Sequence, residues 1–274
     1  MQRNDTLPQV AFAPQGGLCN RLRVLLSAWS LAAEGLAETS VEWGRDDGCH
    51  AWFDQLFCPL EAKHLTVHRR RWWARPITRR NLHWPWLLRH CMGYDRQAAN
   101  YLPDEPRQLA RWVRQYRKIY VSGGSVAYPY DPALLRSLRP VTEVARRIEQ
   151  VTTHFTPHTV GVHIRRTDNA ISCRESSTPL FVDAMNSRLA ADPQTTFFLA
   201  TDDATLKQQL VRRFDGRILT LTEHVTRSSL AGMKHAVVDL YCLARTSSLI
   251  GSYWSSFTDT AAELGGMPVT IVRG

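Results

Sequence analysis

The chain has 274 residues, of which 44% are hydrophobic and 9% are aromatic. This length allows two domains of ordinary size, and the composition excludes an intrinsically disordered chain. The formal net charge of +9 lies almost entirely in the first half, since residues 1–150 carry 22 Lys and Arg against 14 Asp and Glu, whereas residues 151–274 carry 12 against 11. We therefore expect the two halves to meet different partners.

The six cysteines are scattered along the chain and form no C-x-x-C pair, which predicts reduced thiols in a cytosolic protein. The first residues hold no apolar core of signal-peptide length, and no stretch approaches the roughly 20 apolar residues of a membrane-spanning helix. We expect a cytoplasmic location, with any membrane association being peripheral.

The first half opens with a predicted strand, turn and helix. Residues 9–14 (QVAFAP) are expected to form a strand, Gly16 and Gly17 a turn, and the apolar residues from Leu18 to Trp29 recur at helical spacing. Further strands are expected at residues 40–43 and 118–121, and helices at residues 132–138 and 141–151. The Trp-, Arg- and Pro-rich region between those two strands is expected to be irregular.

From residue 159 onward, strands and helices alternate. Such alternation with short connections specifies a parallel sheet with helices on both faces. The predicted fold class is α/β, with two domains, residues 1–150 and 151–274, facing each other across a cleft. In the second domain, strands are expected at residues 159–164, 195–201, 217–221, 247–252 and 268–272, and helices at residues 179–191, 204–214, 235–246 and 256–264.

The hexapeptide HIRRTD, from His163 to Asp168, is the most informative motif. It ends an apolar run, so we expect it where a buried strand opens into a loop, which is where open parallel sheets bind ligands. Arginine stays charged and binds phosphate oxygens bidentately, so Arg165 and Arg166 suit a diphosphate. A purely structural explanation, in which both arginines form salt bridges with neighbouring loops, stays open.

Two further polar clusters end or follow later strands, at residues 199–203 (LATDD) and 252–257 (SYWSSF), and all three are expected at one edge of the sheet. Arginines would neutralise a diphosphate, a carboxylate would accept N–H donors from guanine, and Ser hydroxyls with a helix N-terminus would bind phosphate. This set describes a nucleotide-sugar site. Asp202, Ser255 and Ser256 also suit helix N-caps, a role that does not exclude ligand binding.

The N-terminal turn places Gly16, Gly17, Asn20 and Arg21 between a strand and a helix, where backbone N–H groups can approach an anion closely. The turn matches neither the G-x-G-x-x-G dinucleotide fingerprint nor the G-x-x-x-x-G-K-[ST] phosphate loop. Dinucleotide and ordinary phosphate-loop chemistry are therefore not expected.

Taken together, these motifs resemble the fucosyltransferase superfamily, which includes α1,6-, nodulation-type, α1,2- and protein O-fucosyltransferases. The resemblance rests on H-x-R-R-x-D at residues 163–168, A-T-D-D at residues 200–203, the D-x-x-x-L…S-S-F stretch from Asp239 to Phe257, and the G-G-x-x-N turn at residues 16–20. It implies a GT-B fold with two Rossmann-like domains and an inverting, metal-independent transfer of L-fucose from GDP-fucose.

The resemblance also implies roles for single residues. The second domain would bind GDP-fucose as donor substrate, with no other cofactor, and the first would bind a glycan or glycolipid acceptor. Arg165 would hold the β-phosphate and assist the departure of GDP, with Arg166 supporting it. The other expected donor contacts are His163 and Asp203 on guanosine, Ser255 and Ser256 on phosphate, and Asp202, Phe257, Gly16, Gly17, Asn20 and Arg21.

An inverting transfer calls for a base at the acceptor hydroxyl. Glu175, a short loop beyond the arginine pair, is the first candidate and Asp168 the second, although both also suit structural roles. No metal is expected, because Asp202-Asp203 is not a D-x-D motif and no His/Cys cluster has ligand spacing. Asn169 stands where several relatives carry a basic residue, which makes the donor sugar less certain than the nucleotide.

Residues 62–94 form a basic insert without any acidic residue, and residues 68–90 alone hold seven Arg and four Trp. This composition suits an anionic membrane surface, such as a bacterial inner leaflet where lipid-linked acceptors for polysaccharide biosynthesis are built. Internally packed Trp with solvated Arg, or Trp stacked on an acidic glycan, are the alternatives. Nucleic-acid binding would explain the insert alone, so we do not expect nucleic acid as a partner.

Two other functions stay open at this point. One is a GT-B transferase that uses another nucleotide sugar. The other is a basic module that binds RNA or an anionic membrane on a degenerate transferase fold.

Overall fold

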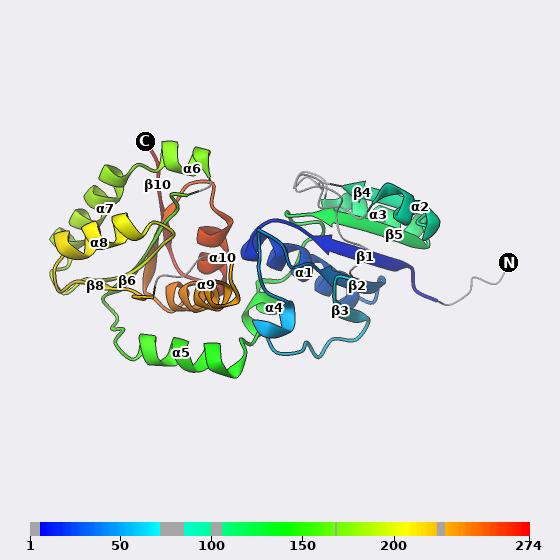
Figure 1. The fold of residues 1–274 in the computed structure, drawn as a ribbon, viewed down its shortest axis with the longest axis horizontal. Helices are drawn as coiled ribbons and strands as arrows, with labels where there is room; N and C mark the ends of the chain where they lie inside the picture. The colour runs from blue at the N-terminus through cyan, green and yellow to red at the C-terminus, as the bar shows by residue number, and fades with distance from the viewer. Residues whose placement is uncertain (1–5, 72–84, 100–105, 168, 224–227) are drawn as a thin grey trace. The chain divides into compact units, whose positions relative to one another are not determined.

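The computed structural model describes residues 6–71, 85–99, 106–167, 169–223 and 228–274. The chain divides into two compact units between Arg139 and Pro140, with a short later segment ending at Met233 grouped with the first unit. Each unit has its own five-stranded parallel sheet (Figure 1). The predicted α/β class with two Rossmann-like domains is confirmed.

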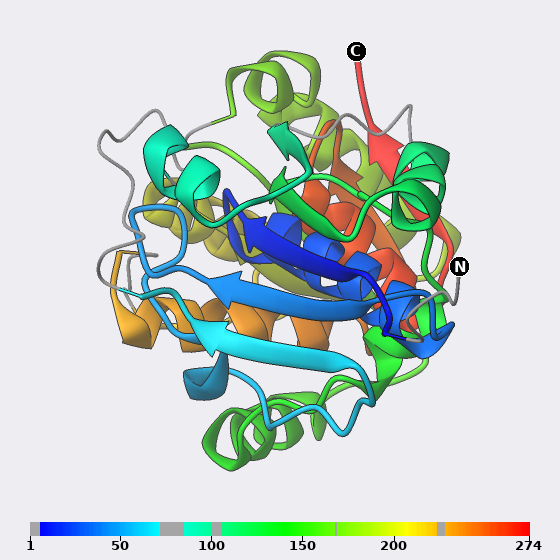
Figure 2. The same cartoon turned by 90° about the vertical axis from the view of Figure 1, so that its right-hand side faces the viewer.

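The first unit orders its strands β3-β2-β1-β5-β4, which Figure 2 shows side by side. The strands are β1 (Gln9–Pro14), β2 (Glu38–Trp43), β3 (Leu65–Arg69), β4 (Arg96–Ala99) and β5 (Lys118–Gly123). The helices are α1 (Leu18–Ala33), α2 (Trp86–Cys91), α3 (Pro106–Gln115), α4 (Pro132–Ser137) and the short 3-10 helix η1 (Phe53–Gln55).

The second unit orders its strands β10-β9-β6-β7-β8, the doubly wound arrangement in which the winding direction reverses between β6 and β9. The strands are β6 (Thr159–Ile164), β7 (Thr196–Thr201), β8 (Ile218–Leu219), β9 (Ser248–Ser252) and β10 (Val269–Val272). The helices are α5 (Thr142–Thr152), α6 (Ala170–Glu175), α7 (Thr178–Ala191), α8 (Ala204–Arg213), α9 (Leu230–Leu243) and α10 (Ser256–Gly265).

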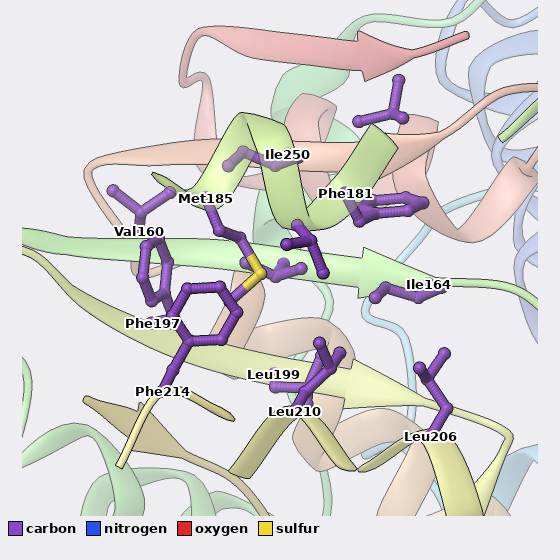
Figure 3. Close-up of a cluster of buried hydrophobic side chains, with 13 residues drawn as sticks. Val160, Ile164, Phe181, Met185, Phe197, Leu199, Leu206, Leu210, Phe214 and Ile250 are labelled. Atoms are coloured by element: carbon purple, nitrogen blue, oxygen red, sulfur yellow. The ribbon is translucent and has the colours of Figure 1, made fainter. Parts of the chain in front are cut away.

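The second unit buries an apolar core on one face of its sheet (Figure 3). Every residue of β6 is buried, as expected for a central parallel strand that reads as one apolar run. Its Val160, Val162 and Ile164 face this core, so His163 and Gly161 alternate to the opposite face. The core residues are Val160, Val162, Ile164, Phe181, Val182, Met185, Phe197, Leu199, Leu206, Leu210, Phe214, Ile250 and Val272.

The expectation of an irregular region between residues 43 and 118 is wrong, because β3, η1, α2, β4 and α3 lie there. β3 pairs with β2 in parallel from Leu65 opposite Thr39 to Arg69 opposite Trp43. Its alternation of Leu65 and Val67 with polar residues is a strand signal, but it is only five residues long and borders the basic insert. The helix expected at residues 235–246 begins earlier, at Leu230.

Candidate functional site

The candidate site of the second unit lies where β6, β7 and β9 end. The backbone N–H of Arg165 donates to Ser252 Oγ at 2.9 Å, which joins the ends of β6 and β9. The Arg165 Nε lies 3.3 Å from Asp202 Oδ2, and the two side chains are 24% and 23% exposed. Arg165 therefore sits at the point where the strand order reverses, which is the usual ligand crevice of a doubly wound sheet.

Asp202 organises the loop that carries the arginines. Its carboxylate accepts hydrogen bonds from the backbone N–H of Arg166 at 2.7 Å, from the N–H of Thr167 at 3.3 Å and from Thr167 Oγ1 at 2.7 Å. A carboxylate that accepts several backbone N–H groups fixes the conformation of the loop. Asp202 thus holds the arginine loop against the end of β7.

The Arg166 guanidinium is engaged by the chain itself, and its NH1 group donates to the carbonyl of Arg165 at 3.0 Å. Its NH2 group donates to the carbonyl of Ser176 at 2.6 Å and to Thr178 Oγ1 at 3.3 Å, and its guanidinium carbon lies 5.8 Å from the ring centroid of Phe181. These contacts tie the arginine loop to the start of α7. Of the pair, Arg165 is therefore the better placed to meet a diphosphate.

Helix α10 presents its N-terminus beside Ser252. Ser255 is its N-cap residue and is 5% exposed, yet its hydroxyl makes no capping hydrogen bond. The first N–H groups of a helix have no partner within the helix and carry a partial positive charge, so they favour an anion. The predicted phosphate-binding serines, Ser255 and Ser256, thus lie at a helix N-terminus as expected.

His163 is a neutral, buried histidine. It is 5% exposed, its Nδ1 lies 2.8 Å from Thr258 Oγ1, and its ring stacks on Phe257 with 4.8 Å between centroids. Burial, together with the charge of Arg165, lowers the pKa of His163 to about 3. The structure brings His163, Phe257 and the α10 N-terminus together beside β6.

In the A-T-D-D motif, the helix cap lies one residue later than the position expected for it. Asp203, not Asp202, is the N-cap of α8, and its Oδ1 accepts from the N–H of Leu206 at 2.9 Å. The expectation that Asp202 caps this helix is wrong, because the helix begins at Ala204 and the cap is the residue immediately before it.

Of the two candidate bases, Glu175 and Asp168, the structure describes only Glu175. Asp168 lies outside the described residues. Glu175 pairs with Arg174, whose NH2 lies 2.9 Å from Oε1, and with Arg273, whose Nε lies 3.3 Å from Oε2. Hydrogen bonds from these two arginines lower the pKa of Glu175, which weakens it as a proton acceptor.

Asp239 is a residue of the quoted motifs to which the sequence analysis gave no role. It lies in α9, where burial raises its pKa to about 7, and its Oδ1 has no hydrogen-bond partner among the described residues. Its Oδ2 lies 3.5 Å from His235 Nε2, one helical turn away. The signal was available, since Asp239 is the single acidic residue of the apolar run AVVDLYCLA.

The glycine turn of the first unit lies where β1 and β5 end, again at a reversal of strand order. Gly16 has a φ of +77°, and a Cβ there would lie 2.8 Å from Asn20 Nδ2, so the turn requires glycine. Arg21 is fully buried and donates to the carbonyls of Gly16 at 2.8 Å and Gly44 at 2.6 Å and to Asp46 at 2.6 Å. Arg21 orders these loops, and the other turn residues remain candidates for a ligand contact.

The basic insert is described only in part, since residues 72–84 lie outside the described residues. Arg69 pairs with Asp54, and Arg70 is 8% exposed. In contrast, Trp86 and Leu87 of α2 are each 65% exposed. Within the described part of the insert, the exposed apolar surface is therefore on α2.

Within the described part of the chain, no group of three or more His, Cys, Asp or Glu side chains has an arrangement that would hold a metal ion. Among the same residues, no helix has both the length and the hydropathy of a membrane span.

The chain was compared with known families, curated proteins and solved structures. No family model matches it, and no curated protein matches its sequence. Its structure resembles that of NodZ α-1,6-fucosyltransferase soaked with GDP-fucose, with a TM-score of 0.63 and 22% identity over 94% of this chain and 93% of that chain. NodZ has also been solved from Bradyrhizobium.

Two further solved structures resemble that of this chain. A mutant of Arabidopsis thaliana FUT1 in complex with GDP has a TM-score of 0.59 and 13% identity over 99% of this chain and 71% of that chain. POFUT1 in complex with GDP has a TM-score of 0.56 and 10% identity over 98% of this chain and 99% of that chain. The chain therefore has the fold of these fucosyltransferase structures.

Proposed function

We propose that this protein is an inverting glycosyltransferase that transfers L-fucose from GDP-fucose to a glycan or glycolipid acceptor. The observation that carries the proposal is the convergence of Arg165, Ser252 and the α10 N-terminus at the reversal point of a doubly wound sheet. The proposal is supported by the shared fold, because the structural neighbours include fucosyltransferases bound to GDP or soaked with GDP-fucose.

The proposed mechanism depends on charge that develops on the diphosphate. When the bond between the sugar C1 and the phosphate oxygen breaks, GDP takes the electron pair and the sugar becomes oxocarbenium-like. A guanidinium held at the β-phosphate stabilises that state more than the ground state, because the negative charge there grows. Arg165 supplies this charge, and the N–H groups of α10 supply a second positive end. We therefore propose that the transfer needs no metal.

We assign guanine recognition to polar side chains from β6, the junction of β7 with α8, and α9. We retain His163 and Asp203 as proposed guanosine contacts and add Asp239. A carboxylate can accept both the ring N–H and the exocyclic amino group of guanine, and Asp239 has an oxygen without a partner among the described residues.

The acceptor hydroxyl must lose a proton as its oxygen bonds to C1. Glu175 and Asp168 remain the proposed bases. The ionised state of Glu175 is secured by Arg174 and Arg273, so it is ready to accept a proton but does so weakly near neutral pH.

We further propose that the first unit meets a lipid-linked acceptor at the cytoplasmic face of a membrane. The exposed Trp86 and Leu87 of α2 lie within the basic insert, and this combination of apolar and basic residues favours an anionic lipid interface. Sedimentation with vesicles that contain anionic lipid tests the proposal. Trp86→Ala with Leu87→Ala should weaken salt-sensitive binding, and unchanged binding would contradict the assignment.

The catalytic proposal is tested by a donor screen with the purified chain. Release of nucleotide from GDP-fucose, GDP-mannose and UDP-sugars is measured with and without EDTA, and Arg165→Ala is compared with Arg212→Ala, an exposed arginine of α8. We expect preference for GDP-fucose, no loss with EDTA, and a fall of about a hundredfold or more for Arg165→Ala only. Preference for another sugar would favour a different transferase. Absence of turnover and of GDP binding would favour a binding module.

A further inference from the structure

Trp254 has an unusual conformation for a bulky side chain. It lies in the loop between β9 and α10, its φ of 55° falls in the left-handed region, and its side chain is 66% exposed. The left-handed region costs a residue with a Cβ roughly 1 kcal/mol or more. The Trp254 indole stays largely exposed, with the Tyr253 ring centroid 6.1 Å away, so burial offsets only part of this cost. Folding alone therefore does not explain a tryptophan here.

The loop is held on both sides of Trp254. Asn169 Nδ2 donates to the carbonyl oxygen of Trp254 at 2.8 Å, while its Oδ1 accepts from the N–H of Ser172 at 3.0 Å and so caps α6. The N–H of Tyr253 donates to Ser176 Oγ at 2.8 Å. Both neighbouring loops thus fix the backbone of Trp254, and the indole is presented on a rigid support.

The position of Trp254 relates it to the proposed phosphate site. Ser252, two residues earlier, accepts the N–H of Arg165, and Ser256, two residues later, opens α10. Two residues of extended chain span at most about 7 Å, which is close to the width of one pyranose ring. In a nucleotide sugar the pyranose is bonded directly to the β-phosphate. The backbone of Trp254 is therefore at most about this far from the α10 N-terminus, and we infer that its exposed indole reaches the sugar.

We propose that Trp254 is the platform on which the donor pyranose stacks, and that Asn169 positions it. This assignment rests on the proposed function and adds a residue that selects the sugar rather than the nucleotide. The apolar C–H face of a pyranose suits an aromatic face, and indole is the best aromatic partner for positive charge. The platform thus stabilises the oxocarbenium-like sugar as the bond to GDP breaks.

The test compares the dissociation constants of GDP and GDP-fucose by calorimetry. The variants are Trp254→Phe, which keeps an aromatic ring, Trp254→Ala, and Trp254→Gly, which removes the ring while relieving the backbone. We expect Trp254→Ala and Trp254→Gly to weaken GDP-fucose binding about three- to tenfold and to leave GDP binding within about twofold of the wild type. Trp254→Phe should bind both ligands about as well as the wild type. Asn169→Ala should also weaken GDP-fucose binding without affecting GDP binding, but by a smaller factor than Trp254→Ala.

The outcomes separate the assignment from the proposed function. If the wild type binds neither GDP nor GDP-fucose, both are overturned. If the wild type binds both ligands and Trp254→Gly binds GDP-fucose equally well, the platform assignment alone is overturned. An equal loss of GDP and GDP-fucose binding in Trp254→Gly also overturns it, because the indole would then act on the nucleotide. Glycine adopts the left-handed backbone without strain, so Trp254→Gly keeps the test valid even if Trp254→Ala does not fold.

Discussion

Replacing Asp239 by Asn should stabilise the second unit by an amount that grows with pH. Burial raises the pKa of Asp239 from 3.8 to about 7 in the folded chain. A carboxyl group with a raised folded-state pKa favours folding most when it is protonated. Its contribution is fully present below pH 3.8 and is lost as the pH rises through about 7. Ionisation of wild-type Asp239 thus opposes folding near neutral pH, and Asn cannot ionise.

The magnitude follows from the size of the shift. A difference of about three pKa units corresponds to about 4 kcal/mol once the pH exceeds both values. Between about pH 5.5 and about pH 8, the advantage of Asp239→Asn should grow by about 2 kcal/mol. Urea unfolding of the wild type and the variant is measured at both pH values, and the change in their difference gives this quantity. Contributions from groups that do not contact Asp239 cancel in this comparison.

The matched control is Asp215→Asn, an exposed aspartate of the same unit with the same change of charge. Its unfolding free energy should follow that of the wild type at both pH values. If Asp239→Asn and the wild type show parallel pH profiles, Asp239 is not a buried carboxyl with a raised pKa. The variant should at the same time bind GDP about ten- to a hundredfold more weakly, because a charge-assisted acceptor for guanine is lost. Increased stability together with unchanged GDP affinity would refute the guanine assignment.

Three further predictions concern the loops of the two units. Arg166→Ala should lower the free energy of unfolding by about 1.5–3 kcal/mol, because the hydrogen bonds to residues 176 and 178 are charge-assisted; loss of donor affinity without loss of stability would contradict this. Gly16→Ala should cost about 1–2 kcal/mol at its φ of +77°, and a neutral effect on urea unfolding would show that the turn can relax. Arg273→Ala should raise the pKa of Glu175, so the acid limb of the kcat/KM profile should move to higher pH; an unmoved limb would exclude Glu175 as the base.

Most of the sheet architecture was predictable because buried parallel strands read as short apolar runs. β6 and β7 illustrate this, since their central residues are buried and their pattern needs no tertiary information. β3 and β4 escaped prediction for the opposite reason. They are short, form the two opposite edges of the first sheet and are rich in polar residues, so the alternation of two or three side chains was too weak a signal.

The sequence predicted which loops form the candidate site, but not which contacts each residue makes there. The rule that parallel strands end at one edge brought Arg165, Asp202 and Ser252 together. Sequence spacing cannot say which of two adjacent arginines turns inward, because the answer depends on the carbonyl of Ser176 and on the start of α7. The burial of Asp239 depends in the same way on contacts across the unit.

The pairing of Arg165 with Asp202 affects which anions can bind at Arg165, because an anion must compete with the Asp202 carboxylate. Before any anion binds, part of the guanidinium charge is already compensated by the carboxylate 3.3 Å away, so a lone phosphate ion gains little by approaching it. A ligand must supply more charge, or further contacts to the α10 N–H groups, to compete with that internal partner. Under the proposed function, the carboxylate that shapes the arginine loop would thereby disfavour small anions relative to a diphosphate that reaches both positive groups at once.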